Sequence, residues 1–104
     1  MSAPMSFGVF RSFALDENLA RLGSMLDDGF DVDAGNELGE TVFMHCCAND
    51  RLVAAKFLLS RGADVNRSDH GGDTASDWAA RNASRAFNAW LARAGGKRRD
   101  AVHY

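Results

Sequence analysis

Leu26-Asp27-Asp28-Gly29-Phe30-Asp31-Val32-Asp33 and Leu59-Ser60-Arg61-Gly62-Ala63-Asp64-Val65-Asn66 are two versions of one segment, placed 33 positions apart. A second pair of matching segments, Gly39-Glu40-Thr41 and Gly72-Asp73-Thr74, has the same spacing. A period of this length is typical of proteins built from stacked helix pairs. Such a stack has no active-site cleft of its own and offers a continuous surface to a macromolecule. The repeat therefore favours a binding function over catalysis.

The residues at the ends of the repeated segments predict where helices begin and end. Gly29 and Gly62 each close a run with helical apolar spacing, as expected for a residue in the left-handed conformation that glycine adopts without steric cost. Thr41 and Thr74 precede apolar segments and can cap helix N-termini, and Thr74 with Asp77 is close to a capping box. No segment shows strand-like alternation, so the predicted class is all-α.

Each repeat also carries an apolar stripe in its second predicted helix. A spacing of i, i+3, i+6 and i+7 places these residues on one helix face, which we expect to be buried. They are Leu19, Leu22, Met25 and Leu26 in the first unit and Leu52, Ala55, Leu58 and Leu59 in the second.

The middle unit resembles an ankyrin repeat along its whole length. Gly39-Glu40-Thr41-Val42-Phe43 stands where that family has G-x-T-P-L, and Lys56 to Asn66 has the form K-L-L-L-x-x-G-A-D-V-N. The third unit is similar through Thr74-Ala75-Ser76-Asp77-Trp78-Ala79, and the first unit mainly through its second helix and Gly29.

This resemblance implies an ankyrin-repeat solenoid of three stacked helix-turn-helix units with short loop fingers. The expected repeats are residues 6–38, 39–71 and 72–95 within one domain of residues 1–95, followed by a C-terminal tail of residues 96–104. The chain departs from the family pattern where Val42 and Ala75 replace proline, and where Met44 and Asp77 replace histidine. The last two changes affect hydrogen bonds between repeats that histidine normally supplies.

The two flanks of each unit predict where the stack ends. One flank is polar only in the first unit, at Arg21 and Ser24, and the other only in the last unit, at Arg85 and Asn88. Terminal repeats need a solvated outer face, whereas internal interfaces need apolar ones. We therefore expect a finished stack of three units with those four side chains exposed. The residues expected to be largely buried include Phe57, Leu58, Phe87, Trp90 and Leu91.

Composition narrows the class of protein. The 104 residues are 46% hydrophobic and 25% charged, which is ordinary for one globular domain. No apolar run reaches the roughly 18–20 residues of a membrane span, and no secretory signal is visible, so we expect a cytoplasmic protein without a membrane partner. The abundance of Ala, Arg and Gly suggests a bacterial source.

The net charge of −2 is unevenly distributed along the chain. Residues 1–52 carry nine acidic and three basic side chains, a net charge of −6, and residues 53–104 carry +4. This axis of charge could orient a partner and speed association. Solvated surface with no selected role is the alternative, and the sequence leaves both open.

Several polar clusters could carry chemistry, and for each we favour a structural role. Three successive helical residues point about 100° apart, so His45-Cys46-Cys47 cannot converge on one metal ion, and we expect two reduced core thiols. Asp31 and Asp33 coincide with turn positions of the repeat. No catalytic or nucleotide-binding motif is visible. We expect no enzymatic activity, no cofactor and no metal site.

Two further features are assigned structural roles. Trp78 and Trp90 fall on core-type positions of the repeat, so we expect them to pack rather than to bind a ligand. The short basic segment Lys97-Arg98-Arg99 follows a glycine pair and is expected to be a solvated tail or the fringe of a protein interface.

The ankyrin resemblance implies that a partner lies against the loop tips and the inner face of the first helices. The loop tips supply Gly35, Glu37, Leu38 and Glu40, then Ser68, His70, Gly71 and Asp73, and the first-helix ends supply Ala48, Asn49, Arg81 and Asn82. Leu38 stands out because an apolar side chain at a loop tip costs solubility unless a partner covers it. A single exposed leucine is also common on protein surfaces.

The favoured function is a non-enzymatic module that binds one protein partner as a monomer. An immunity protein or inhibitor that caps a toxin or enzyme is the first alternative, since the acidic first unit would suit a basic active site. The second is a nucleic-acid accessory protein that uses the basic C-terminal half, although a nucleic-acid partner is not the one we expect.

Overall fold

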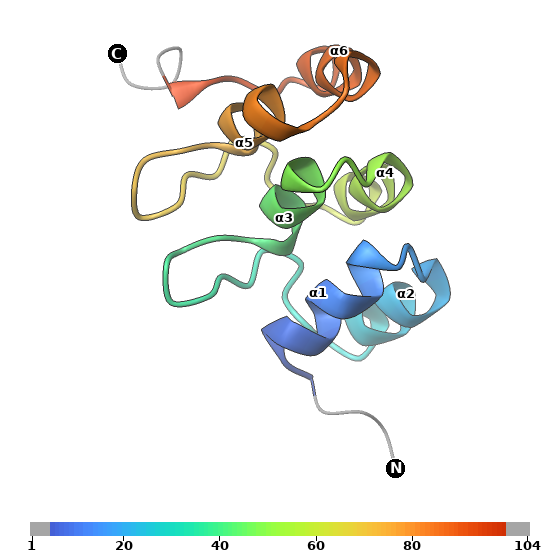
Figure 1. Ribbon diagram of the computed structural model, residues 1–104. Coiled ribbons are helices and arrows are strands. Elements are labelled where there is room, and N and C mark those ends of the chain that lie inside the picture. The colour runs from blue at the N-terminus through green and yellow to red at the C-terminus, as the bar shows by residue number, and fades with distance from the viewer. Residues whose placement is uncertain (1–4, 100–104) are drawn as a thin grey trace.

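The computed structural model describes residues 5–99, which form six helices in three stacked pairs. The helices are α1 (Phe7–Leu15), α2 (Leu19–Asp27), α3 (Val42–Ala48), α4 (Leu52–Ser60), α5 (Ala75–Asn82) and α6 (Arg85–Arg93). Two long loops between the pairs project to the same side of the stack (Figure 1). Within residues 5–99 the β-pairing consists of two isolated bridges, Gly35 with Thr41 and Ser68 with Thr74. The prediction of an all-α solenoid is confirmed.

The core runs through all three pairs. One phenylalanine of each pair is fully buried or nearly so: Phe10 on α1, Phe43 on α3 and Phe87 on α6. Of the residues expected in the core, Leu58, Phe87 and Leu91 are buried, but Phe57 and Trp90 are only partly buried. Phe57 lies beside Gly23, which has no side chain to cover its ring.

The expected helix caps form. Thr41 and Thr74 each accept a hydrogen bond from the backbone three residues on, and each starts a capping box. In the second box the Asp77 carboxylate accepts from the Thr74 backbone at 2.9 Å, and in the first the Met44 sulfur takes that place at 3.4 Å. Gly29 and Gly62 have φ of 102° and 95°, the left-handed conformation that their places after α2 and α4 require.

One carboxylate ties each helix pair to the next. Glu17 accepts from the backbone of Ala54 in the first turn of α4 at 2.8 Å, and Asp50 accepts from the backbone of Ser84, the N-cap of α6, at 3.1 Å. Glu17 and Asp50 stand 33 positions apart and both have positive φ, 55° and 58°. Ala83 holds the equivalent position in the last pair with an ordinary φ of −104°. The acidic residue is thus present in the two pairs that have a further pair after them.

A second set of contacts continues into the C-terminal segment. Asp33 accepts from the backbone of Asp64 at 2.9 Å, and 33 residues on Asn66 accepts from the backbone of Lys97 at 2.8 Å. Gly95, with φ of 96°, makes the same turn after α6 that Gly62 makes after α4. The side chains of residues 97–99 are exposed, as expected for a solvated tail or the fringe of an interface, but their backbone is held by the preceding loop and by α5.

One residue at the end of the stack differs from expectation. Arg21, Ser24 and Arg85 are exposed as predicted, but Asn88 is half-buried. Its side-chain amide donates to the carbonyl oxygens of Ala79, Ala83 and Ser84, so it satisfies backbone groups at the end of α5. These contacts lie within the helix pair of Asn88 itself. We expected this polar side chain to be exposed to solvent, but it bonds backbone carbonyl oxygens of its own pair instead.

Candidate functional site

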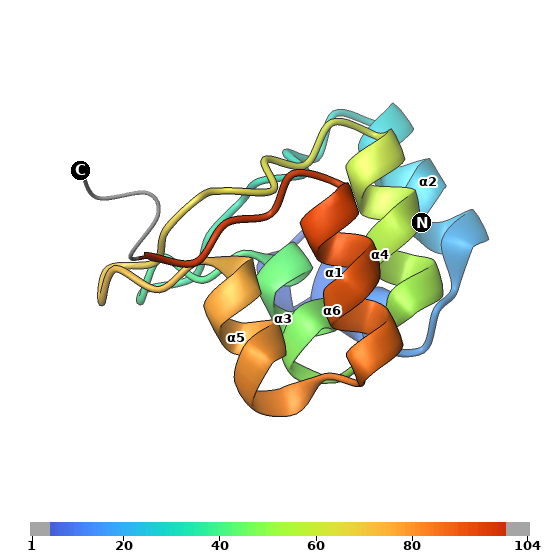
Figure 2. The same cartoon turned by 90° about the horizontal axis from the view of Figure 1, so that it is seen from above.

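The two projecting loops form adjacent fingers, which we call finger 1 (residues 34–41) and finger 2 (residues 67–74). Figure 2 shows both on the side of α3 and α5, away from α4. They are joined near their tips, where the backbone of His70 donates to the carbonyl oxygen of Leu38 at 2.9 Å. The His70 ring lies against Gly39, where an added Cβ would stand 2.5 Å from the ring. The two tips therefore form one continuous surface.

Each finger is held rigid by one side chain at its base. The Asn36 side-chain oxygen accepts from the backbones of Leu38 and Glu40, both at 3.0 Å. In finger 2 the Asp69 carboxylate accepts from Gly71 at 2.9 Å and from Asp73 at 3.0 Å. Sequence reasoning overlooked Asn36 and Asp69, although their 33-residue spacing ahead of a glycine turn was a usable signal.

The tip side chains of finger 1 are open to a partner. Leu38 is 62% exposed, and Glu37 and Gly35 are also exposed. Between finger 1 and the start of α1 lies an open groove of about 420 Å³. We call it the finger 1 groove; its lining is Phe7, Gly35, Asn36, Glu37 and Leu38.

Glu40 is engaged in a chain of polar contacts across the first two pairs. Its carboxylate accepts from the Asn36 amide at 2.9 Å and lies 3.0 Å from His45 Nε2, while Arg11 Nε donates to His45 Nδ1 at 2.6 Å. The hydrogen bond from Asn36, followed by the one from His45, holds the pKa of Glu40 below its ordinary value. Glu40 therefore fixes finger 1 against α3.

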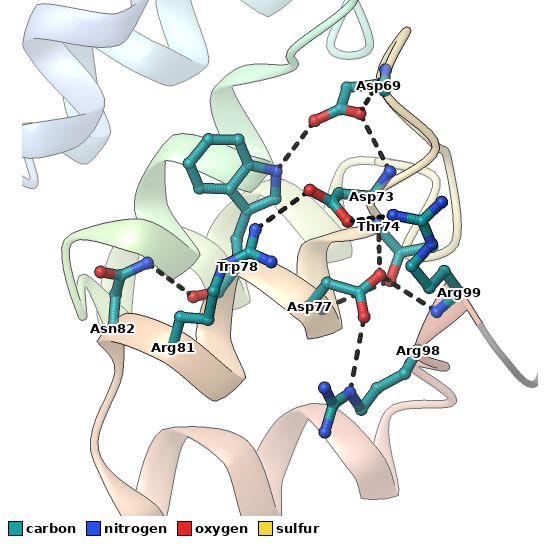
Figure 3. A network of polar contacts seen from close by, with 10 residues as sticks. Asp69, Asp73, Thr74, Asp77, Trp78, Arg81, Asn82, Arg98 and Arg99 are labelled. Carbon is teal, nitrogen blue, oxygen red and sulfur yellow. Dashed lines mark hydrogen bonds and ion pairs between the residues drawn. The ribbon is translucent and has the colours of Figure 1, made fainter.

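The third pair carries a denser polar network on the same side (Figure 3). Trp78 Nε1 donates to Asp69 at 3.2 Å, and the Arg81 guanidinium lies 5.4 Å from the centre of the Trp78 ring and 3.1 Å from Asp73. Arg99 also reaches Asp73, at 3.2 Å. Trp78 is half-buried and fastens finger 2 to α5, which is a packing role with a polar contact added.

Asp77 lies at the centre of this network and is 2% exposed. It accepts hydrogen bonds from the backbone and hydroxyl of Thr74, from the Arg99 backbone at 3.0 Å and from Arg98 Nε at 3.4 Å. Burial acts to raise the pKa of Asp77, but these hydrogen bonds outweigh it and hold the pKa below its ordinary value. The aspartate thus anchors the C-terminal segment to α5.

The candidate residues fall into two groups in space. The finger residues Gly35, Glu37, Leu38, Glu40, Ser68, His70, Gly71 and Asp73 lie on the joined fingers. The group of Ala48, Asn49, Arg81 and Asn82 lies at the other end of α3 and α5. Asn49 and Asn82 each donate to the carbonyl oxygen four residues earlier, so their side chains close their own helices. Arg81 alone reaches back to a finger, through Asp73.

Comparison with known protein families identifies the family of this chain. A family model for ankyrin repeats in three copies matches residues 13–99. This chain belongs to the ankyrin repeat family. Ankyrin repeats are in general modules for protein–protein interaction, and the fold is a typical non-enzymatic scaffold.

The chain is also similar to individual proteins, over part of its length or at lower sequence identity. Inversin of Homo sapiens and of Canis lupus familiaris is 42% identical over 55 residues, and Inversin of Danio rerio 38%. The match covers 53% of this chain and only 5% of each Inversin. Among solved structures, the ankyrin repeat domain of human ASB11 superposes with a TM-score of 0.74 at 25% identity, covering 85% of this chain and 40% of that one.

The remaining chemical features of residues 5–99 are few. No cluster of three His, Cys, Asp or Glu side chains in this part of the ankyrin stack is arranged to hold a metal ion. Cys46 and Cys47 are free and fully buried, as predicted, and burial raises the pKa of Cys46 to about 12 and raises that of Cys47 further. No helix between residues 5 and 99 has the length and apolar character needed to span a bilayer.

Proposed function

We propose that this ankyrin stack binds one protein partner through its joined fingers and the inner face of α1, α3 and α5. The observation that carries the proposal is the exposed pair Glu37 and Leu38 on finger 1. The backbone of this loop is fixed by hydrogen bonds to the Asn36 side chain and by the bond from His70. A rigid loop loses little conformational entropy on binding, so its exposed side chains can contribute their full contact energy. A fixed apolar side chain beside a groove can serve as an anchor point for a partner.

The test begins with affinity purification of the partner from the native host. The variant Glu37→Lys with Leu38→Asp is then expected to abolish binding in titration calorimetry, because it removes an apolar anchor and reverses a charge, changes worth about 1–3 kcal/mol each at a packed interface. The melting temperature should be nearly unchanged, since neither side chain is used by the fold. Unchanged affinity in this folded variant would refute binding through finger 1.

An inhibitor or immunity protein is a narrower form of the same proposal. The acidic half of the chain, with a net charge of −6 over residues 1–52, suits a basic active site. Inhibition of the purified partner's activity by stoichiometric amounts of this chain would support this form. An unaffected activity would indicate that the chain binds its partner without inhibiting it.

A nucleic-acid accessory protein that uses the basic C-terminal half is the other alternative. Arg98 and Arg99 each form an ion pair, with Asp77 and Asp73, so part of the charge that these two residues could offer to phosphates is already engaged. Our proposal therefore keeps a protein partner, together with a monomeric state and a cytoplasmic location. Light scattering on the purified protein tests the monomeric state.

A further inference from the structure

The finger 1 groove has a chemistry that specifies what it can hold. Phe7 on α1 and Leu38 on finger 1 are its apolar side chains, and they face a shared open volume of about 420 Å³. This space is large enough for an aliphatic or aromatic side chain of a partner. An apolar side chain placed there would cover Leu38, which is otherwise the most exposed large apolar residue of the described chain.

The polar groups of the groove add a second requirement. The Asn36 side chain is engaged within finger 1, because its oxygen accepts from two backbone groups and one of its two N–H groups donates to Glu40. Glu37 is exposed, and no ion pair or side-chain hydrogen bond joins it to another residue of the described chain. The carboxylate at the edge of this groove is therefore available to a cation that a partner brings.

The groove also exists before a partner arrives. Finger 1 is held by Asn36 from within, by His70 from finger 2 and by the contact of Glu40 with His45 on α3. The Phe7 ring meets the His45 ring edge-on, with 5.5 Å between ring centres, which fixes the opposite wall. A preformed site selects its ligand by shape and charge with little reorganisation.

We infer that the finger 1 groove anchors a partner segment in which a large apolar side chain stands directly beside a lysine or arginine. The apolar side chain packs between Phe7 and Leu38, and the neighbouring cation pairs with Glu37. This inference rests on the proposed function and adds to it the kind of sequence that is recognised.

The test uses a random linear peptide library displayed on phage and selected against the purified chain. Enriched peptides are expected to share a Leu, Ile, Met, Phe or Trp next to Lys or Arg. A synthetic peptide of that sequence should bind the Leu38→Ser variant at least about tenfold more weakly. Val53→Ser is the matched control, because Val53 is 54% exposed on α4 and away from the fingers, and it should leave binding unchanged.

A charge exchange tests the role of Glu37. Glu37→Lys should weaken binding of the same peptide at least about fivefold. A second peptide, in which glutamate replaces the cation, should bind this variant better than it binds the parent chain. At physiological salt, Asp28→Lys, an equal change of charge at an exposed site after α2, should do neither. Loss of binding without restoration by the exchanged peptide would overturn the pairing with Glu37.

Other outcomes separate this inference from the proposed function. Enriched peptides without a cation, or peptides unaffected by Leu38→Ser but lost on Arg81→Asp, would overturn the groove inference while leaving binding on the inner face intact. A dimer that dissociates in the Leu38→Ser variant would overturn it by showing that a second copy covers the groove. Purified partner that binds both the Glu37→Lys, Leu38→Asp variant and the Arg81→Asp variant normally would remove the proposed function itself.

Discussion

Glu17 and Asp50 have a left-handed backbone conformation that residues other than glycine rarely adopt. In this conformation each side chain reaches the next helix pair. The strain of such a conformation is of order 1 kcal/mol or more. A hydrogen bond to a charged group contributes about 1.5–3 kcal/mol, and a carboxylate at a helix N-terminus also interacts favourably with the helix dipole. The contact therefore outweighs the strain only while the next pair is in place.

A substitution of Glu17 tests this coupling. Glu17→Ala should lower the free energy of unfolding by about 1–3 kcal/mol, because the strain remains and the cap of α4 is lost. Glu17→Gln, which keeps an acceptor oxygen, should lose less. Urea unfolding followed by circular dichroism measures both, and equal stability of Glu17→Ala and the parent would show that the contact contributes nothing.

The carboxylates of Asp77 and Glu40 make stability depend on pH. Each has a pKa below its ordinary value, 3.8 for Asp77 and 4.5 for Glu40, so each binds a proton more weakly in the folded chain than in the unfolded chain. Their stabilisation is fully present above the unfolded pKa and is lost as pH falls through the folded pKa. The free energy of unfolding should therefore fall steadily below about pH 5.

The Asp77→Asn variant provides the comparison for this pH profile. It should be less stable at neutral pH, because the pairing with Arg98 loses its charge, and its stability should change less between pH 5 and pH 3. The free energy of unfolding is measured by chemical unfolding at each pH. Parallel pH profiles for the variant and the parent would argue against a role of Asp77 in the loss of stability at low pH.

At the scale of elements, the fingers depend on one another through Gly39. Its φ of 76° suits glycine, and a Cβ there would press on the His70 ring. Gly39→Ala should cost about 1–2 kcal/mol of stability and separate the two tips, and so weaken partner binding. Gly8→Ala is the control, since an added Cβ at Gly8 on α1 meets no atom within 4 Å and should be neutral or slightly stabilising.

Amide exchange tests whether Gly39→Ala separates the two fingers. Amide exchange at His70, whose backbone bonds Leu38, should become faster in this variant and stay unchanged in Gly8→Ala. Protection that is equal in both variants would mean that the fingers are joined by something other than this contact.

Much of each element was predictable from local sequence. The 33-residue period, the glycines after α2 and α4 and the threonine caps are short-range features, and short-range features decide where helices begin and end. The contacts of Glu17, Asp50 and Asn88 were missed because their partners are chosen by the packing of other elements. The exposure of Leu38 was foreseeable, but the groove beside it was not, since Phe7 lies on α1, far from finger 1 in the sequence, and is brought there only by packing.

At the scale of the whole molecule, charge is arranged along the stack. The acidic residues concentrate in the first two helix pairs and the basic ones in the last, and the long dimension of the molecule is 46 Å. At physiological salt, charges farther apart than about 8 Å are largely screened, so each end presents its own field to a partner. Whether this field has a role in association can be measured.

The association rate with the purified partner is expected to fall several-fold between about 20 mM and 300 mM salt, while the dissociation rate changes little. Stopped-flow fluorescence of Trp78 and Trp90 follows the reaction. The Asp28→Lys variant should reduce the rate at low salt if the acidic end steers the partner. An association rate independent of salt would assign the charge axis to ordinary solvated surface.

Five contacts between repeats share one direction, whereas Arg11 on α1 donates forward to His45 on α3. Glu17, Asp33, Asp50 and Asn66 are acceptors that lie earlier in the chain than the backbone groups they bind, and the Leu38 carbonyl likewise precedes His70. During synthesis on the ribosome, each emerging helix pair thus meets acceptors that are already in place on the pair before it. The stack can therefore be completed in the order in which it is translated, and the first pair serves as the template for the rest.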